Sequence, residues 1–276
     1  NTVMLKSIIG CVLLIGNSEI GIYQSIPIVG AVGQGTFNNN EPYNGFSQVG
    51  YPDPNLKWER ANQMDVGLDL EFWSGRIALT TDYYYRLTSD LLLNNEIPTT
   101  TGFSQSTTNV GSVVNRGLEI ALNSANIDNN EFSWSTNFNI SFNSNEVKDI
   151  ASENDVFLAG ALFLPPGWSI LREGEPIGTF FGYQTDGIFQ SDTEIANGPL
   201  LSAQINGNTA KPGDRRFKDQ GSRDAQGNLT SQPDGIINEA DRVILGNAYP
   251  DFFYGITNNF KYKGFDFSFF IQGSQG

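Results

Sequence analysis

The sequence predicts an all-β fold, an antiparallel transmembrane β-barrel of which this chain forms one part. Residues 132–143, FSWSTNFNISFN, carry apolar side chains at nearly every second position and serine or asparagine between them. Successive side chains of a strand point to opposite faces, so this strand separates an apolar medium from a polar one. The pattern recurs along the chain, and short and long connections alternate between the segments, as in outer-membrane barrels.

The composition agrees with a turn-rich β protein, because only 17% of the 276 residues are charged while the chain holds 30 Gly and 12 Pro. It lacks the run of about 18 apolar residues that would predict a membrane-spanning helix. The formal charge of -14 argues against nucleic acid as a partner, since phosphate binding depends on Lys and Arg. Cys11 is the single cysteine, so the chain cannot form an internal disulfide.

Histidine is absent from the sequence, which excludes several classes of catalytic site. A Ser-His-Asp or Cys-His pair cannot be assembled, nor can a zinc site that includes histidine. Carboxylate-pair chemistry, as in glycosidases, is the main catalytic alternative that remains.

The first two segments are the least regular. Residues 4–15, MLKSIIGCVLLI, are apolar on both faces. They favour a buried or mistranslated strand over a secretory signal, because no clear cleavage site follows them. Residues 26–57 are rich in Gly, Pro and Asn and predict a long loop.

From residue 58 the alternation is regular. Strands are expected at 63–73, at 76–93 and at 116–127, with a short turn at Ser74-Gly75 and a loop at 94–110. The turn DNNE at 128–131 then leads into the strand at 132–143.

After residue 150 a long irregular region follows, interrupted by a strand-like stretch at 179–190. Alternation returns at 252–262, and a tight turn at Lys263-Gly264 precedes a last strand from Phe265. Aromatic residues near strand ends fit the interfacial girdles of a barrel. A secreted β-sandwich with an aromatic core is the alternative, and long strands with uncharged polar faces favour the barrel.

One segment has the spacing of a metal site. Residues 234–241, DGIINEAD, match the second half of a Ca²⁺ loop, in which a glycine makes the sharp turn and oxygen ligands follow at fixed positions. The opening ligand is separated from this half by an insertion, and solvated carboxylates in an Asx turn are the alternative. The candidate ligands are Asp219, Asp234, Ile236 through its carbonyl, Asn238 and Asp241.

Other candidates are weaker. Glu173 and Glu175 are a possible catalytic pair, but two residues apart on a loop they are expected to be solvated. The carboxylates Asp65, Asp69 and Glu71 share one strand face and are expected to line a lumen. A further set of side chains has the chemistry to stack on sugar rings, although packing within the loop region is the simpler expectation: Phe180, Phe181 and Tyr183.

Several stretches together resemble the barrel portion of SusC/RagA-like TonB-dependent outer-membrane transporters. They occur in family order from residue 16 onward. The stretches are GNSEIG, NLKWERANQMDVGLDLEF, YYYRLTSDLLL, GFSQSTTNVGSVVNRGLEIALN, FSWSTNFNISFNSNEV, GEPIGTFFGYQTDGIFQ, PGDRRFKD and DGIINEADRVILGNAYPDFFYGITNNFKYKGFDFSFFIQGSQG. In that family the segment from Asp214 through Asp219 and Asp234 to Asp241 resembles a Ca²⁺-type loop, and this sequence carries the insertion SRDAQGNLTSQP within it.

The resemblance implies a non-enzymatic role in active nutrient import across the bacterial outer membrane. The substrates would be oligosaccharides or peptides, and the implied partners are a SusD-like surface lipoprotein, the TonB complex and outer-membrane lipid. Residues 1–276 would be a partial barrel domain without its plug domain, and 150–250 a long extracellular excursion. Residues 1–15 replace an alternating strand of the family, for which a reading-frame shift upstream of Gly16 is our hypothesis. The alternatives are a secreted β-sandwich that binds or hydrolyses glycans, and a passive porin or adhesin.

Overall fold

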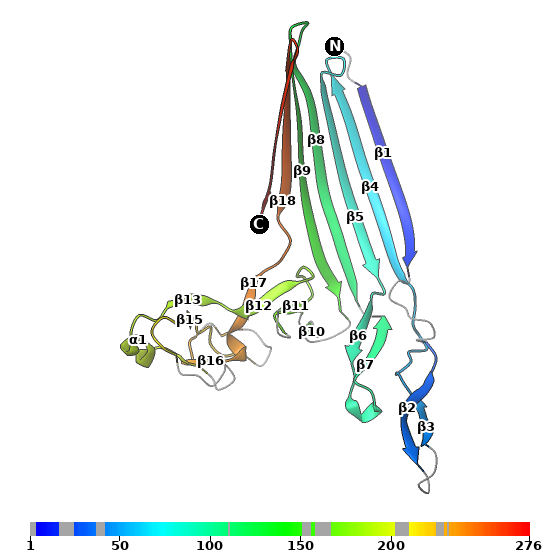
Figure 1. Ribbon diagram of the computed structural model, residues 1–276, viewed down its shortest axis with the longest axis vertical. Helices are drawn as coiled ribbons and strands as arrows, with labels where there is room; N and C mark the ends of the chain where they lie inside the picture. Colours follow the sequence, from blue (N-terminus) through cyan, green and yellow to red (C-terminus); the bar gives the residue numbers. More distant parts are fainter. Residues whose placement is uncertain are drawn as a thin grey trace. The chain divides into compact units, whose positions relative to one another are not determined.

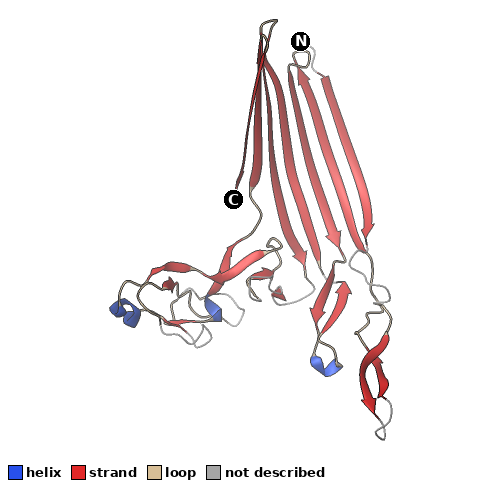
Figure 2. Ribbon diagram, in the orientation of Figure 1, coloured by secondary structure: helices blue, strands red, loops and turns tan. Residues whose placement is uncertain are grey.

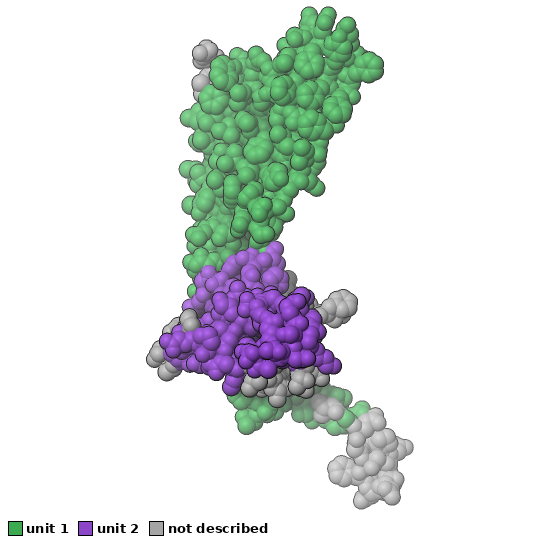
Figure 3. All heavy atoms as spheres, turned by 90° about the vertical axis from the view of Figure 1, so that its left-hand side faces the viewer, with its two compact units in different colours: residues 1–153, 249–276 green, residues 154–248 purple. Residues whose placement is uncertain are grey.

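The computed structural model describes residues 4–16, 25–36, 42–109, 111–150, 156–157, 167–201, 210–224, 229–230 and 232–276. The chain divides into two compact units. One unit holds residues 1–153 and 249–276, and the other holds residues 154–248 (Figure 3). Among the described residues, no helix is long and apolar enough to cross a membrane.

The first unit is built on a sheet of seven long strands. Each strand pairs antiparallel with its neighbours, in the order β1-β4-β5-β8-β9-β18-β19 (Figure 1). The prediction of an all-β antiparallel barrel fold is therefore confirmed, and strands dominate the ribbon (Figure 2). The bounds are β1 Met4–Gly16, β4 Glu59–Phe72, β5 Ile77–Ser89, β8 Ser112–Asp128, β9 Phe132–Asp149, β18 Phe252–Tyr262 and β19 Phe265–Gln275.

The register of these strands gathers the apolar positions on one face. Leu122 lies opposite Phe138, and Phe138 lies opposite Ile256, so apolar side chains continue from strand to strand. Directly opposed residues of an antiparallel pair share a face, and a one-residue slip would move every side chain to the other face. The alternation in the sequence therefore fixes the register, and we call this apolar side the outward face and the polar side the inward face.

Short turns join neighbouring strands at one end of the sheet. At the first turn Trp73 and Ser74 have positive φ angles of 53° and 57°, next to Gly75 at 84°. At the second, the Asn129 side chain accepts the backbone N–H of Phe132 at 2.8 Å. The third turn has Lys263 at a φ of 54°. All three predicted turns are confirmed, and we refer to this end as the turn side.

The apolar segment at the start of the chain forms β1. It pairs with β4 along its whole length, from Met4 opposite Glu71 to Gly16 opposite Glu59. Its lack of alternation does not prevent pairing, because the ladder is made by backbone groups. The prediction of a strand here is confirmed, but the strand is not buried within the described residues, since Ile9 is 75% exposed. The frame-shift hypothesis stays a hypothesis.

Two predictions at the other end of the sheet were wrong in part. The strand expected at 76–93 ends at Ser89, because Asp90 adopts a positive φ of 57° that breaks the ladder. The loops expected at 26–57 and 94–110 contain hairpins, whose short strands are too polar or too glycine-rich to show a period. These hairpins are β2 Val29–Thr36 with β3 Pro42–Gln48, and β6 Leu92–Glu96 with β7 Gln105–Asn109, joined through the 3-10 turn η1 Thr99–Thr101.

The second unit is more ordered than the sequence predicted. Its largest sheet has the order β10-β11-β12-β17, and its strands have five residues or fewer, too short for alternation to reveal them. Its core includes the buried side chains of Ile170, Phe181 and Ile237. The elements are β10 Val156–Phe157, β11 Ser169–Leu171, β12 Thr179–Tyr183, β13 Thr185–Ile188, α1 Asp192–Asn197, β14 Leu200–Leu201, β15 Arg215–Phe217, β16 Ile236–Ile237, η2 Glu239–Asp241 and β17 Arg242–Gly246. That this unit is an extracellular excursion stays a prediction.

Candidate functional site: the inward wall and the acidic loop

The inward face of β4, β5 and β8 carries a group of carboxylates. Asp82 lies directly opposite Glu119 in the register, and both side chains are exposed. Like charges directly opposite each other across a strand pair are destabilising. The meeting of these two carboxylates therefore does not stabilise the pairing of β5 with β8.

Glycines in neighbouring strands give these side chains room. A Cβ on Gly67 would come within 2.5 Å of an Asp82 carboxylate oxygen. A Cβ on Gly117 would lie 2.5 Å from Cε1 of Tyr84 and 2.7 Å from the backbone oxygen of Phe142. The Tyr84 ring thus lies against Gly117, and its hydroxyl donates to Oδ1 of Asn143 at 2.7 Å.

The result is a hollow of about 640 Å³ on the inward wall. Polar side chains line it, and within the described part of the chain the buried Nε of Arg86 has no hydrogen-bond partner. The lining consists of Gln63, Asp65, Asp82, Tyr83, Tyr84, Arg86, Asn115 and Glu119. This surface offers hydrogen-bond donors and acceptors to a polar solute.

Only part of this wall was singled out from the sequence. Asp65 lines the hollow as part of the expected lumen surface, while Asp69 accepts the Thr80 hydroxyl at 2.8 Å on the same face. Glu71 continues the face toward the turn side, opposite Ala78. Asp82 and Glu119 were visible as alternating polar positions, but only the register shows that they meet.

The acidic loop of the second unit is closed by carboxylate bonds to backbone amides. Asp219 accepts the N–H groups of Gly221 at 3.0 Å, Asp234 at 3.2 Å and Gly235 at 2.7 Å. It therefore joins the two sides of the insertion. Asp234 in turn accepts the N–H of Ile236 at 2.9 Å, which makes the Asx turn that was the alternative to a cation site.

Asp241 holds the other end of the loop. Only 1% of its surface is exposed, and its two carboxylate oxygens accept the N–H groups of Gln220 at 2.7 Å and Asn238 at 2.8 Å. The side chain of Asn238 caps the following 3-10 turn by accepting the N–H of Ala240 at 2.7 Å. The structure thus brings all five predicted ligand residues into one hydrogen-bonded loop.

The side chains have the chemistry for calcium, but their oxygens point at backbone donors. Among the described residues, no three acidic or cysteine side chains come close enough to share an ion. Backbone N–H groups donate to the carboxylate oxygens of Asp219 and Asp241. Calcium binding here stays a prediction, and calorimetry with Ca²⁺ on the complete receptor tests it: a flat titration refutes it.

The other candidates have structural roles. Glu173 and Glu175 belong to a tight turn in which the N–H of Glu175 donates to the Arg172 carbonyl at 3.1 Å. Phe181 is buried, and Cζ of the Arg242 guanidinium lies 4.9 Å from the centroid of the Phe181 ring. Tyr183 packs on Phe217 with centroids 5.7 Å apart. The packing expected for these aromatics is confirmed for Phe181 and Tyr183.

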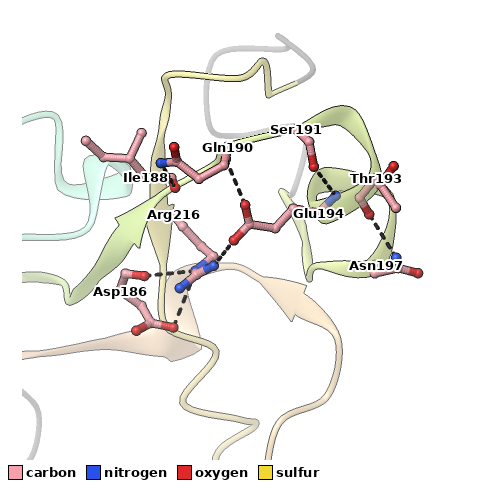
Figure 4. A network of polar contacts seen from close by, with 8 residues as sticks. All are labelled: Asp186, Ile188, Gln190, Ser191, Thr193, Glu194, Asn197 and Arg216. Carbon is pink, nitrogen blue, oxygen red and sulfur yellow. Dashed lines mark hydrogen bonds and ion pairs between the residues drawn. The ribbon is translucent and has the colours of Figure 1, made fainter.

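A charged network ties α1 to β15 in the same unit (Figure 4). The Arg216 guanidinium donates to the Asp186 carbonyl at 2.8 Å and pairs with the Glu194 carboxylate. Glu194 also accepts the N–H of Gln190 at 2.7 Å. The network joins one guanidinium to two carboxylates and so ties α1 to β13 and β15 within the unit.

Comparisons with known proteins give a consistent result. A family model described as TonB dependent receptor-like, beta-barrel matches residues 28–186. TonB-dependent receptor P3 of Formosa agariphila is 36% identical over 95% of this chain and 24% of its own length. TonB-dependent receptor SusC of Bacteroides thetaiotaomicron is 32% identical over 80% of this chain and 20% of its own length.

A solved structure gives the same fold. The RagAB peptide importer in its open-open state superposes with a TM-score of 0.70 at 20% sequence identity, covering 99% of this chain and 26% of that one. The chain therefore spans about a quarter of the length of the relatives it matches.

Proposed function

Because the chain belongs to the TonB-dependent receptor-like β-barrel family, we propose that it forms part of the wall of an outer-membrane importer. The family match removes the secreted β-sandwich alternative. In this role the inward wall would face the solute that is transported.

The observation that carries the proposal is the two-faced seven-stranded sheet. Its outward face exposes large apolar side chains, such as Ile9 at 75% and Phe265 at 79% exposure. Soluble proteins rarely expose an apolar surface of this extent to water. On β4, β5, β8 and β9 its inward face carries mainly amides, hydroxyls and carboxylates. A wall with lipid on one side and an aqueous lumen on the other requires this pattern.

We propose oligosaccharides or peptides as the imported substrates. One structural relative is a peptide importer, and amide and hydroxyl groups on the inward wall suit either class. The inward carboxylates near Asp82 favour neutral or cationic solutes, because a cleft lined by one sign of charge repels ions of that sign.

The proposed partners follow from the same relatives. A SusD-like surface lipoprotein would cap the loop end of the barrel, and the TonB complex would supply energy from the periplasmic side. The proposed location is the bacterial outer membrane.

The experiment measures substrate uptake by cells that produce a receptor as long as the matched relatives and containing this segment. Fluorescent oligosaccharides and peptides are supplied with TonB present or deleted. We expect accumulation that depends on TonB and on the proton gradient. Equal accumulation in both strains would support the passive porin alternative, and no accumulation of either substrate class would remove the proposed substrates.

A further inference from the structure

The hollow on the inward wall holds charges of both signs that do not neutralise one another. Arg86 forms its cationic end, and Asp82 and Glu119 form its anionic end. Within the described part of the chain, none of these three side chains takes part in an ion pair or a side-chain hydrogen bond. The hollow therefore has two uncompensated ends of opposite charge.

The strand itself keeps the two ends apart. Asp82 and Arg86 both lie on the inward face of β5, with Tyr84 between them. At about 3.4 Å per residue, the Cα atoms of Asp82 and Arg86 are about 14 Å apart along the strand. Their side chains do not meet, and a solute in the hollow has access to both.

At the cationic end, the polar neighbours of Arg86 are engaged elsewhere. Gln63 lies opposite Arg86 on β4, and its amide donates to Oδ1 of Asp65 at 2.9 Å. Asn115 lies opposite Arg86 on β8, and its Oδ1 accepts from Nδ2 of Asn145 at 2.7 Å. The half-buried guanidinium is left without a counter-ion. A carboxylate suits it best, because the two groups form parallel charge-assisted hydrogen bonds.

At the anionic end, two carboxylates face one position. Asp82 and Glu119 are directly opposed across β5 and β8, so their Cα atoms lie about 4.5–5.5 Å apart. Like charges at this spacing repel each other, and a cation between them removes the repulsion. An ammonium group carries three donors and can bind both carboxylates at once.

The space between the two ends suits a slender solute. Gly117 lies opposite Tyr84, and the Tyr84 ring occupies the place of a side chain at 117. The bond from its hydroxyl to Asn143 holds the ring against the wall. The volume of about 640 Å³ falls within the range of about 300–1,000 Å³ that is typical of small-ligand sites.

We propose that the hollow binds a short peptide with free termini, about four residues long. Four extended residues span about 13–14 Å, which matches the distance along β5 between the two ends. The α-ammonium group lies between Asp82 and Glu119, toward the turn side, and the α-carboxylate binds Arg86. A neutral oligosaccharide leaves all three charges uncompensated. The inference rests on the proposed import function and adds to it the substrate class of this site and the direction in which the substrate lies.

Equilibrium dialysis with radiolabelled tetra-alanine tests this on a purified receptor as long as the matched relatives and containing this segment. Two blocked peptides are compared with it: tetra-alanine amide, which lacks the carboxylate, and N-acetyl-tetra-alanine, which lacks the ammonium group. The parent receptor should bind the free peptide about tenfold more tightly than either blocked form, the effect expected for one charge-assisted hydrogen-bonded pair. Equal affinity for free and blocked peptides overturns the proposal and requires no variant that might fail to fold.

Variants assign the two ends. Arg86→Gln should weaken binding of the free peptide about tenfold and leave binding of the amide unchanged. Asp82→Asn combined with Glu119→Gln should weaken the free peptide and leave the N-acetyl form unchanged. Glu71→Gln, on the inward face but outside the hollow, is the control and should bind all three peptides like the parent. Equal weakening of free and blocked peptides would mean that the charges act only on the structure of the wall.

Failure of this inference is distinguishable from failure of the proposed function. A receptor that imports oligosaccharides in a TonB-dependent manner but does not bind tetra-alanine refutes the peptide site and leaves the import function intact. If, in addition, the double carboxylate variant has a lower melting temperature than the parent, Asp82 and Glu119 pair with another part of the receptor. A receptor that imports neither class refutes the function itself.

Discussion

At the scale of single residues, glycines decide how side chains lie on the inward wall. A larger residue at 117 would collide with the Tyr84 ring and, more rigidly, with the Phe142 carbonyl. The glycine at position 10 of β1 has open space, since nothing lies within 4 Å of the Cβ position. The two positions form a natural pair of test and control.

Gly117→Ala is expected to destabilise the barrel wall by about 1–3 kcal/mol, the usual range for forced overpacking. Gly10→Ala should leave stability unchanged or slightly raised, because alanine restricts the unfolded chain. Thermal loss of β-sheet circular dichroism in detergent measures both. Equal midpoints for the two variants would show that Tyr84 and the Phe142 carbonyl do not pack on residue 117 as described.

In the acidic loop, Asp241 is buried whereas Asp234 is exposed. Asp241→Asn is expected to destabilise the second unit by about 2–4 kcal/mol, because an amide group turned toward the N–H of Gln220 or Asn238 leaves a buried donor unpaired. Asp234→Asn is the control, since an exposed asparagine oxygen still accepts the N–H of Ile236. Limited proteolysis within residues 154–248 reads out the difference, and equal cleavage rates would contradict it.

The pH dependence of the same unit has a definite direction. Burial raises the pKa of the Tyr183 phenol above its ordinary value; Glu239 and Asp241 add to the shift, and Arg242 opposes it. The folded state therefore holds this proton more tightly than the unfolded chain. Stability is unaffected below about pH 10 and falls as the pH rises through the raised pKa.

Tyr183→Phe removes that titration, so the variant should resist proteolysis within residues 154–248 to a higher pH than the parent protein. A titration from pH 9 to 12 measures the two midpoints. Coincident midpoints would mean that Tyr183 ionises as freely in the folded unit as in the unfolded chain.

At the scale of elements, β1 shows that backbone pairing tolerates an unusual sequence. The register places Cys11 directly opposite Met64 on the outward face. Opposed residues of an antiparallel pair have Cα atoms about 4.5–5.5 Å apart, within the range that a disulfide spans. Because Cys11 is the single cysteine, one added thiol reports on the register.

Met64→Cys is therefore expected to form a disulfide with Cys11 under mild oxidation, detected by a mobility shift that a reductant reverses. Val66→Cys, one row away, should not cross-link efficiently. If Asp65→Cys cross-links in place of Met64→Cys, β1 is shifted by one residue and its two faces are exchanged.

Elements also show how far sequence reasoning reaches. The strands at 63–73, 116–127 and 132–143 were predicted because a long strand between lipid and water must alternate for its whole length. The sheet of the second unit was not predicted, since strands of two to five residues show too few repeats for a period. The hairpins were not predicted because their strands are too polar or too rich in glycine to alternate. The candidate site was also predicted only in part. The position of Asp65 on the polar face follows from the alternation within one strand. The meeting of Asp82 with Glu119 depends on how two strands pair, which the sequence pattern does not give.

At the scale of the whole molecule, the proposed function requires lipid against the exposed outward face and neighbouring strands beside β1 and β19, each of which pairs with one strand among the described residues. Unpaired backbone groups of an open edge do not occur within hydrocarbon. The chain spans about a quarter of the length of its relatives, which accounts for the remaining wall. Under the proposed function, the two-faced sheet is therefore expected to be stable as part of a closed barrel in a membrane.

The proposed barrel wall is tested most directly by single-particle cryo-electron microscopy in lipid nanodiscs. The sample is a receptor as long as the matched relatives and containing this segment. We expect seven consecutive wall strands in the order β1-β4-β5-β8-β9-β18-β19, with Phe138 and Ile256 toward lipid and Asp82 and Glu119 toward the lumen. A map that places any of these strands outside the wall, or that turns the apolar face toward the lumen, would contradict the account.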